Sequence, residues 1–164
     1  MRDQALSFRD VQDAGDLARL EAALRALSAD IGEDYACPDA ALGHALTGPH
    51  PAAHGLLALH QDQTLGAALY SPVFSTVRGA AGVYVSDLWV SSDARGQGIG
   101  ARLLAQVAQK GARHWHAAWL KLAVYDHSTA SQQFYQRLGF EHATGMQEMR
   151  LGAQGVSELI KRTP

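Results

Sequence analysis

The chain has 164 residues, 47% of them hydrophobic, with a formal net charge of -2 and a pI near 6.4. This size and composition predict one globular domain over residues 1–164 with a sizeable core. The charge argues against nucleic acid as a partner, and no apolar run is long enough to predict a membrane span. The single cysteine, Cys37, rules out an internal disulfide and favours a cytoplasmic location.

Hydrophobic periodicity predicts the elements of the first half of the chain. Residues 6–11 alternate as a short strand, and residues 13–27 carry leucines at helical spacing. A short second helix is expected to begin near Pro38 and to end near Ala45. Three strand-like runs follow, at residues 53–60, 65–74 and 82–90. Their short connections predict an antiparallel meander.

The second half predicts a mixed sheet with further helices. The expected elements are a helix over 99–113, a strand over 119–124, a helix over 128–138, and final strands over 140–144 and 147–151. Gly139 is the expected stop of the second of these helices. Residues 155–164 are weakly amphipathic and are expected to pack on the body, to pack on a partner subunit, or to fray. The order of elements predicts an α/β fold, a mixed central sheet flanked by helices.

The most informative segment is Arg95-Gly96-Gln97-Gly98-Ile99-Gly100, between the strand-like run that ends at Val90 and the following helix. Such a turn leaves backbone N–H groups open at a helix N-terminus, which favours a phosphate or pyrophosphate. A Walker loop would need Lys and Ser/Thr next, where the chain has Ala101 and Arg102, and a dinucleotide fingerprint would need a different glycine spacing. On this segment alone, an ordinary glycine-rich turn between a strand and a helix remains an alternative interpretation.

A second segment runs from Asp126 to Phe140 and contains Ser131, Phe134-Tyr135 and Leu138-Gly139-Phe140. Together the two segments resemble the cofactor loop and the later signature helix of the GNAT superfamily of N-acetyltransferases. Residues 83–90, 95–100 and 128–135 lean toward its spermidine/spermine (diamine) type. Ser128 stands where that pattern usually has Asn, and serine is also a good helix N-cap. The resemblance covers roughly residues 66–151.

The resemblance implies acetyl-CoA as co-substrate and assigns the residues that hold it. The pantetheine and acetyl group would be bound largely by backbone groups of Leu88, Trp89 and Val90, beside a bulge or splay in the strand. The pyrophosphate would be held by Arg95, Gly96, Gln97, Gly98, Ile99, Gly100 and Ala101. Ser128 and Ser131 complete the expected cofactor residues. Side-chain alternation predicts Tyr84, Ser86, Leu88 and Val90 on one face of the strand and Val85, Asp87 and Trp89 on the other.

The chemistry of acetyl transfer needs a general acid and a general base. Tyr135 is the candidate acid, because a phenol can donate a proton to a departing thiolate. Asp87 is the candidate base, although the diamine type usually carries Glu-Asp where this chain has Ser86-Asp87. A structural role for Asp87, a base on another loop and a water chain remain alternatives.

The acceptor is expected to be a small cationic amine. The stretch from Asp30 to Asp39 lies where the superfamily usually places its acceptor loop, and Asp30, Glu33 and Asp34 would attract a cation. Polyamines, basic amino acids and their analogues therefore lead, and a solvated surface loop is the alternative. Direct attack on acetyl-CoA in a ternary complex is the expected mechanism.

Other functions stay open from sequence alone. A protein lysine or N-terminal acetyltransferase would use the same chemistry, and a non-catalytic acyl-CoA-binding module would lack it. No metal is expected, because the closest histidine pair, His114 and His116, has no neighbouring cysteine or carboxylate. A homodimer is expected, since members of the superfamily often dimerise and the tail carries Val156, Leu159 and Ile160.

Overall fold

The computed structural model describes residues 6–163. Within them lies one mixed sheet with strand order β1-β2-β3-β4-β5, in which β4 and β5 are parallel and the other neighbours antiparallel. The strands are β1 (Ser7–Asp10), β2 (His54–His60), β3 (Gln63–Ser75), β4 (Ala80–Val90) and β5 (Trp119–Leu122). The predicted α/β class and the antiparallel meander are confirmed.

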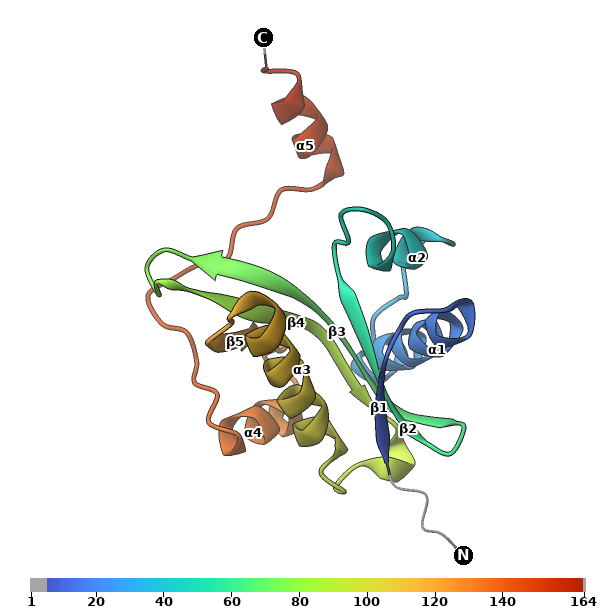
Figure 1. Cartoon of the computed structure of the whole chain (residues 1–164). Helices are drawn as coiled ribbons and strands as arrows, with labels where there is room; N and C mark the ends of the chain where they lie inside the picture. Colours follow the sequence, from blue (N-terminus) through green and yellow to red (C-terminus); the bar gives the residue numbers. More distant parts are fainter. Residues whose placement is uncertain (1–5, 164) are drawn as a thin grey trace, which may run out of the picture. The chain divides into compact units, whose positions relative to one another are not determined.

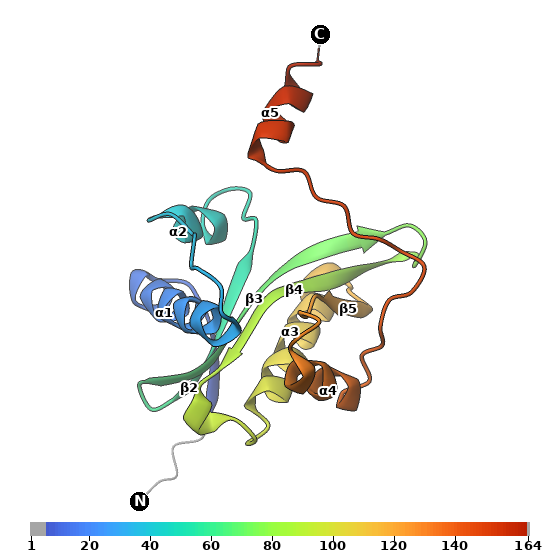
Figure 2. The same cartoon turned by 180° about the vertical axis from the view of Figure 1, so that it is seen from behind.

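Contacts along the chain form two compact units, which join between Thr129 and Ala130. The first unit holds the whole sheet together with helices α1 (Ala14–Ile31), α2 (Ala41–Leu46) and α3 (Ile99–Trp115). Helices α1 and α3 lie on opposite faces of this sheet (Figures 1 and 2). One domain over residues 1–164 stays a prediction. Within residues 6–163, no helix has the length and apolar character needed to cross a membrane.

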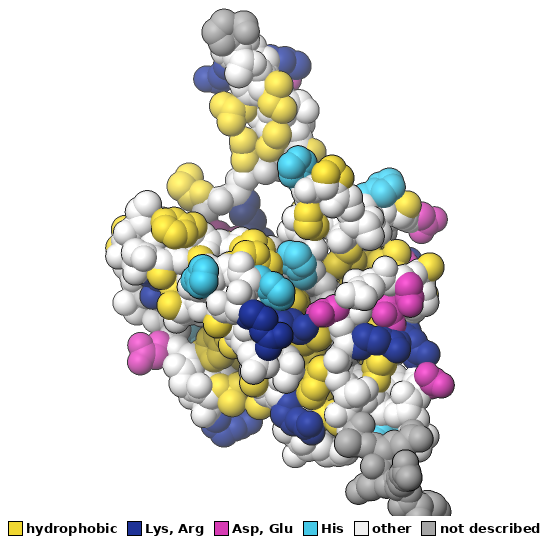
Figure 3. All heavy atoms as spheres, viewed as in Figure 1, with side chains coloured by type: hydrophobic (Ala, Val, Ile, Leu, Met, Phe, Trp, Pro, Cys, Tyr) yellow, Lys and Arg dark blue, Asp and Glu magenta, His cyan; other side chains and the backbone are white. Residues whose placement is uncertain are grey.

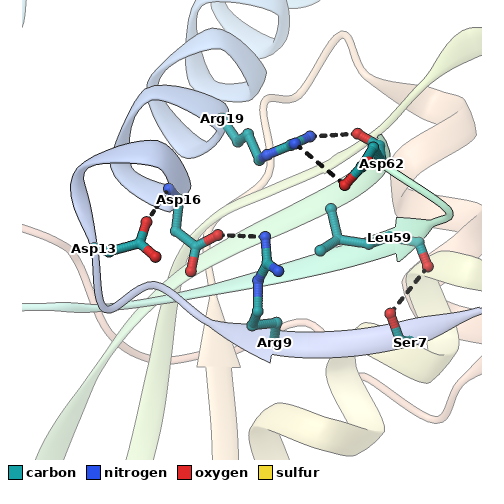
Figure 4. A network of polar contacts seen from close by, with 7 residues as sticks. All are labelled: Ser7, Arg9, Asp13, Asp16, Arg19, Leu59 and Asp62. Atoms are coloured by element: carbon teal, nitrogen blue, oxygen red, sulfur yellow. Dashed lines mark hydrogen bonds and ion pairs between the residues drawn. The ribbon is translucent and has the colours of Figure 1, made fainter.

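Polar contacts fix the start of α1 against β1. The Asp13 side chain caps the helix by accepting a hydrogen bond from the Asp16 N–H at 2.8 Å. The Asp16 carboxylate, only 3% exposed, pairs with the Arg9 guanidinium at 2.5 Å (Figure 4). One turn later, Arg19 contacts both the carboxylate and the backbone carbonyl of Asp62 in the β2–β3 turn. These contacts orient α1 along the sheet.

The end of α1 lies further along the chain than the leucine spacing predicts. Gly32 adopts a left-handed conformation with φ 75°, and the Glu33 N–H donates to the Ser28 carbonyl at 2.9 Å. This is the capping geometry that glycine favours at a helix C-terminus. As a result Asp30 belongs to the last turn of the helix and not to the loop that follows.

The second unit contains α5 (Ala153–Ile160) and all but the first residue of α4 (Thr129–Arg137). The predicted strands at 140–144 and 147–151 are wrong, because this whole stretch is irregular. Its apolar residues are too sparse to bury one face of a strand: Met146 is 74% exposed and Met149 is 93% exposed. Gly145, with φ 76°, also interrupts any extended run.

Candidate functional site

The glycine-rich segment forms an open turn at the start of α3. Gly96 and Gly98 both have φ 76°, a conformation that other residues rarely adopt, and Ile99 begins the helix. Among the described residues, the backbone N–H groups from Gly96 to Ala101 donate to no backbone acceptor, and the first helical bond is from Arg102 to Gly98. Unpaired N–H groups at a helix start are a suitable site for an anion.

Packing places this turn beside the end of β4. Ile99 is 4% exposed and Leu103 is fully buried, and both lie against Gly66 of β3. A Cβ on Gly66 would come within 2.9 Å of the Leu103 Cδ1, so the close approach requires glycine. Gly66 is the cross-strand partner of Val90. The start of α3 therefore lies next to the last residue of β4.

A β-bulge at Ser86 divides β4 into two halves. Tyr70 pairs with Val85 and Leu69 pairs with Asp87, which leaves Ser86 as the extra residue. Its hydroxyl donates to the Leu69 carbonyl at 3.1 Å. Cross-strand partners share a face, so Val85 and Asp87 lie on opposite faces of the sheet. The predicted regular alternation across residues 84–90 is wrong for this reason.

The two faces after the bulge follow from the same register. Asp87 and Trp89 share the face of Leu69, and Leu69 and Trp89 pack against the cluster that includes α1. Leu88 and Val90 share the opposite face, where Val83 contacts α3 at Gly111. The bulge thus directs Asp87 toward the α1 side of the sheet.

Beyond the bulge, the outer edge of β4 loses its strand partner. The β5 ladder ends where Val85 pairs with Leu122, whereas β4 continues to Val90. The Ser91 N–H points to β3, since it donates to the Leu65 carbonyl. Backbone groups alternate between the two edges of a strand, so those of Leu88 and Val90 point to the open edge. These are two of the backbone positions expected to contact the cofactor.

The Asp87 carboxyl is partly buried on the α1 side of the sheet. Burial raises the pKa of Asp87 above its ordinary value, and hydrogen bonding with Ser86 opposes the rise. A carboxylate with a raised pKa is a stronger base than an exposed one. Tyr35 and Cys37 of the acidic segment pack against the same cluster as Leu69 and Trp89, which share the face of Asp87. The acidic segment therefore covers the face on which the candidate base lies.

The acidic residues of that segment are placed differently from one another. Glu33 and Asp34 are exposed. The Asp30 carboxylate instead points to the glycine-rich turn, where its Oδ2 contacts the Arg95 Nη2 at 2.5 Å and the Trp89 Nε1 at 3.2 Å. The Arg95 Nε donates to the Val90 carbonyl at 3.0 Å. Arg95 Nε and Nη2 therefore both donate to protein atoms.

In the second unit, Tyr135 lies in a small aromatic group. Gly139, with φ 90°, ends α4, and the Phe140 N–H donates to the Tyr135 carbonyl at 3.0 Å. This reversal brings the Phe140 ring to 5.5 Å from the Tyr135 ring, edge to face, and the Phe134 ring lies 5.1 Å from the Tyr135 ring. Burial raises the pKa of Tyr135 to about 12, so the phenol keeps its proton at neutral pH.

The two serines of the second motif lie at the start of α4. Ser128 directly precedes the helix, and its N–H donates to the Tyr125 carbonyl at 3.0 Å. Ser131 is exposed in the first turn. Among residues 6–163, no group of three or more His, Cys, Asp or Glu side chains is arranged to hold a metal ion.

The model of the acetyltransferase (GNAT) family matches residues 21–140. The chain belongs to this family. The family prediction is confirmed. Thialysine N-epsilon-acetyltransferase of Bos taurus is 34% identical over 80 residues, covering 49% of this chain and 46% of the relative. The Mus musculus protein of the same name is 32% identical over 101 residues, covering 60% and 58%. These relatives support the lean toward the diamine type.

The chain spans about half the length of the curated relatives it matches. Solved structures support the GNAT fold over nearly the whole chain. An integron cassette protein from the mobile metagenome of V. cholerae has a TM-score of 0.75 at 23% identity, covering 95% of this chain and 98% of its own. An aminoglycoside N-acetyltransferase in complex with CoA has a TM-score of 0.73 at 20% identity, covering 92% and 97%.

Three features of the site were missed by sequence reasoning. Gly66 carried a usable signal, because a glycine inside a strand often marks a close approach. The unpaired position of Ser86 had no local signal, although a bulge near this strand was expected. The contact between Asp30 and Arg95 joins residues 65 positions apart, and no pattern along the chain indicates it.

Proposed function

We propose that this chain is an acetyl-CoA-dependent N-acetyltransferase that acts on a primary amine of a small cationic acceptor. Polyamines, basic amino acids and their analogues are the acceptor class. The observation that carries the proposal is the open edge of β4 at Leu88 and Val90, next to the unpaired N–H groups from Gly96 to Ala101. A long phosphorylated thioester requires both: open backbone groups for its amide-containing arm and an anion-binding turn for its phosphates.

The residues present fit acetyl-CoA. The N–H groups from Gly96 to Ala101 would hold its pyrophosphate, since they have no other backbone acceptor among the described residues. The backbone of Leu88 and the N–H of Val90 would bind the pantetheine arm, and Ser128 and Ser131 would add hydroxyl contacts. When bound, acetyl-CoA supplies an acetyl group activated as a thioester.

The protein's own task in the reaction is to move two protons. Asp87 would take one proton from the acceptor ammonium, directly or through water, so that the neutral nitrogen can attack the acetyl carbon. A C–N bond forms and the C–S bond breaks. The Tyr135 hydroxyl, whose raised pKa of about 12 keeps it protonated, would give a proton to the departing sulfur, and the second proton that the nitrogen loses would return to the phenolate. Attack is direct, with both substrates bound together.

The charge of the α1 side supports a cationic acceptor. Exposed Glu33 and Asp34 belong to the segment that covers the face of Asp87, and negative charge there raises the local concentration of a cation. The name of the curated relatives, thialysine N-epsilon-acetyltransferase, is compatible with an acceptor of this class.

The proposal extends to a cytoplasmic homodimer. Val156, Leu159 and Ile160 lie at helical spacing on α5 and are 42%, 57% and 63% exposed. Figure 3 shows hydrophobic side chains on the surface of this helix. Burial of this stripe against a second copy would remove apolar surface from water. Light scattering after gel filtration tests it: a dimer that dissociates in Ile160→Asp supports the proposal, and a monomeric wild type contradicts it.

The test of the activity is release of free thiol from acetyl-CoA in the presence of polyamines, lysine analogues, aminoglycosides and a lysine peptide. We expect saturation with one small-amine class and a loss of about 10²- to 10⁴-fold in kcat for Tyr135→Phe. Saturation with the peptide alone would indicate a protein acetyltransferase. CoA binding without turnover of any amine would indicate a non-catalytic module.

A further inference from the structure

The last turn of α1 is joined to the cofactor-facing segments by a single carboxylate oxygen. Asp30 Oδ2 accepts from Arg95 Nη2 at 2.5 Å, in the turn before α3, and from Trp89 Nε1 at 3.2 Å, in the second half of β4. Arg95 Nε also donates to the Val90 carbonyl at 3.0 Å. Three separate segments of the first unit therefore converge at Asp30.

We propose that Asp30 is a positioning residue that fixes the anion-binding turn against the end of β4, and that the Arg95 side chain acts as a link within the protein and not as a pyrophosphate ligand. This rests on the proposed function, because it concerns the same cofactor site. It also assigns Asp30 to the cofactor site and not to the acceptor site, because the Asp30 carboxylate contacts Arg95 and Trp89. Glu33 and Asp34 are exposed.

The geometry explains why the link matters for the turn and not for global stability. Gly96 and Gly98 are conformationally permissive, so the turn between β4 and α3 needs restraint to keep its N–H groups aimed in one direction. Arg95, directly before Gly96, provides that restraint by bonding the Val90 carbonyl on one side and Asp30 on the other. Both partners of the ion pair are about half exposed, at 51% and 42%, so its effect on unfolding is small.

The two possible roles of Arg95 predict opposite results for Asp30→Asn. If Asp30 positions the turn, losing its charge releases Arg95, loosens the turn and weakens CoA binding. If Arg95 binds pyrophosphate directly, the same change removes a competing carboxylate, frees the guanidinium for phosphate and tightens CoA binding. The sign of the change therefore separates the two roles.

The experiment is calorimetric titration of wild type, Asp30→Asn, Arg95→Gln and the double variant with CoA, with thermal unfolding of each. We expect each single variant to bind CoA about five- to tenfold more weakly, and the double variant to bind about as weakly as either single one. The thermal midpoints should change by about 2 °C or less. Asp62→Asn is the matched control, because it removes an Asp–Arg contact of α1 that lies at the β2–β3 turn (Figure 4), and its CoA affinity should equal that of wild type.

Steady-state kinetics give the second readout. A positioning role raises KM for acetyl-CoA in Asp30→Asn and leaves KM for the amine unchanged, whereas an acceptor role does the reverse. Unchanged or tighter CoA binding by Asp30→Asn, with wild type binding normally, overturns the inference alone. Failure of wild type to bind CoA overturns the proposed function together with it.

Discussion

The two halves of β4 have the same strand conformation and different surroundings. Gly82 to Val85 pair with β3 on one side and β5 on the other, and Val83 is fully buried beneath α3. Asp87 to Val90 pair only with β3, and at their end the Val90 carbonyl accepts from Arg95 of the glycine-rich turn. One unpaired residue, Ser86, separates the halves.

The comparison shows how a sheet can be both scaffold and binding surface. In the first half, every edge is used by the fold, so the residues there contribute to stability. In the second half, the loss of β5 leaves the backbone groups of Leu88 and the N–H of Val90 for another partner, while the Val90 carbonyl accepts from Arg95. The bulge also turns Asp87 to the face opposite Val85. Variants on either side of Ser86 should therefore affect different properties.

The largest effect is expected in the second half, for Asp87→Asn. Removal of the candidate base should lower kcat by about 10²- to 10⁴-fold while the fold stays intact. Catalysis needs Asp87 without its proton, and burial raises its pKa, so wild-type kcat/KM should fall as pH falls through that raised pKa. This acidic limb of the kcat/KM profile should lie at higher pH than an exposed aspartate would give. It should be absent in the residual activity of Asp87→Asn.

Thiol-release rates across pH measure both effects. Asp62→Asn serves as the control, since it removes an exposed carboxylate at the β2–β3 turn. Asp87→Asn with wild-type kcat and the same acidic limb would show that the base lies elsewhere, and the second half of β4 would then bind cofactor without contributing to proton transfer.

Deletion of Ser86 tests the bulge itself. Without it, Val85 and Asp87 become neighbours opposite Tyr70 and Leu69, so both halves keep their partners and faces while the kink disappears. We expect the fold to persist, as judged by circular dichroism, and CoA to bind about tenfold more weakly by calorimetry. Equal CoA affinity in the folded deletion variant would mean that the bulge does not shape the site.

The smallest effect on function is expected in the first half, for Gly82→Ala. A methyl group there would overlap the indole of Trp119 on β5, so the free energy of unfolding should fall by about 1–3 kcal/mol. Urea denaturation measures this loss, and the CoA affinity of the folded protein should not change. Gly152→Ala is the control, since a Cβ there meets no atom within 4 Å. Weakened CoA binding without loss of stability in Gly82→Ala would erase the distinction between the halves.

The order of elements could be predicted from the sequence because each strand and helix of the first unit carries its own periodicity. The register could not, because the extra residue at Ser86 looks like any other in an apolar run and yet reverses the faces that follow. The prediction of the final strands was wrong because it rested on weak alternation. Residues 140–151 have too few apolar side chains to bury one face of a strand.

The candidate site could be predicted from the sequence only where its residues are close together along the chain. The glycine-rich turn and the Leu138-Gly139-Phe140 reversal are local, and both have left-handed glycines where the motifs place them. The contacts of Asp30 with Trp89 and Arg95 depend on the tertiary fold. The leucine spacing ends the first helix at Leu27, whereas Asp30 makes these contacts from the last turn of α1.

The most direct test is a titration of the uniformly ¹⁵N-labelled protein with CoA, followed through its backbone amide resonances. The account predicts that the amides of Gly96, Gly98 and Gly100 shift strongly together with those of Leu88 and Val90, while Gly55 and Gly82 stay unchanged. CoA binding that leaves the three glycines of the turn unshifted, or no binding at all, would contradict it.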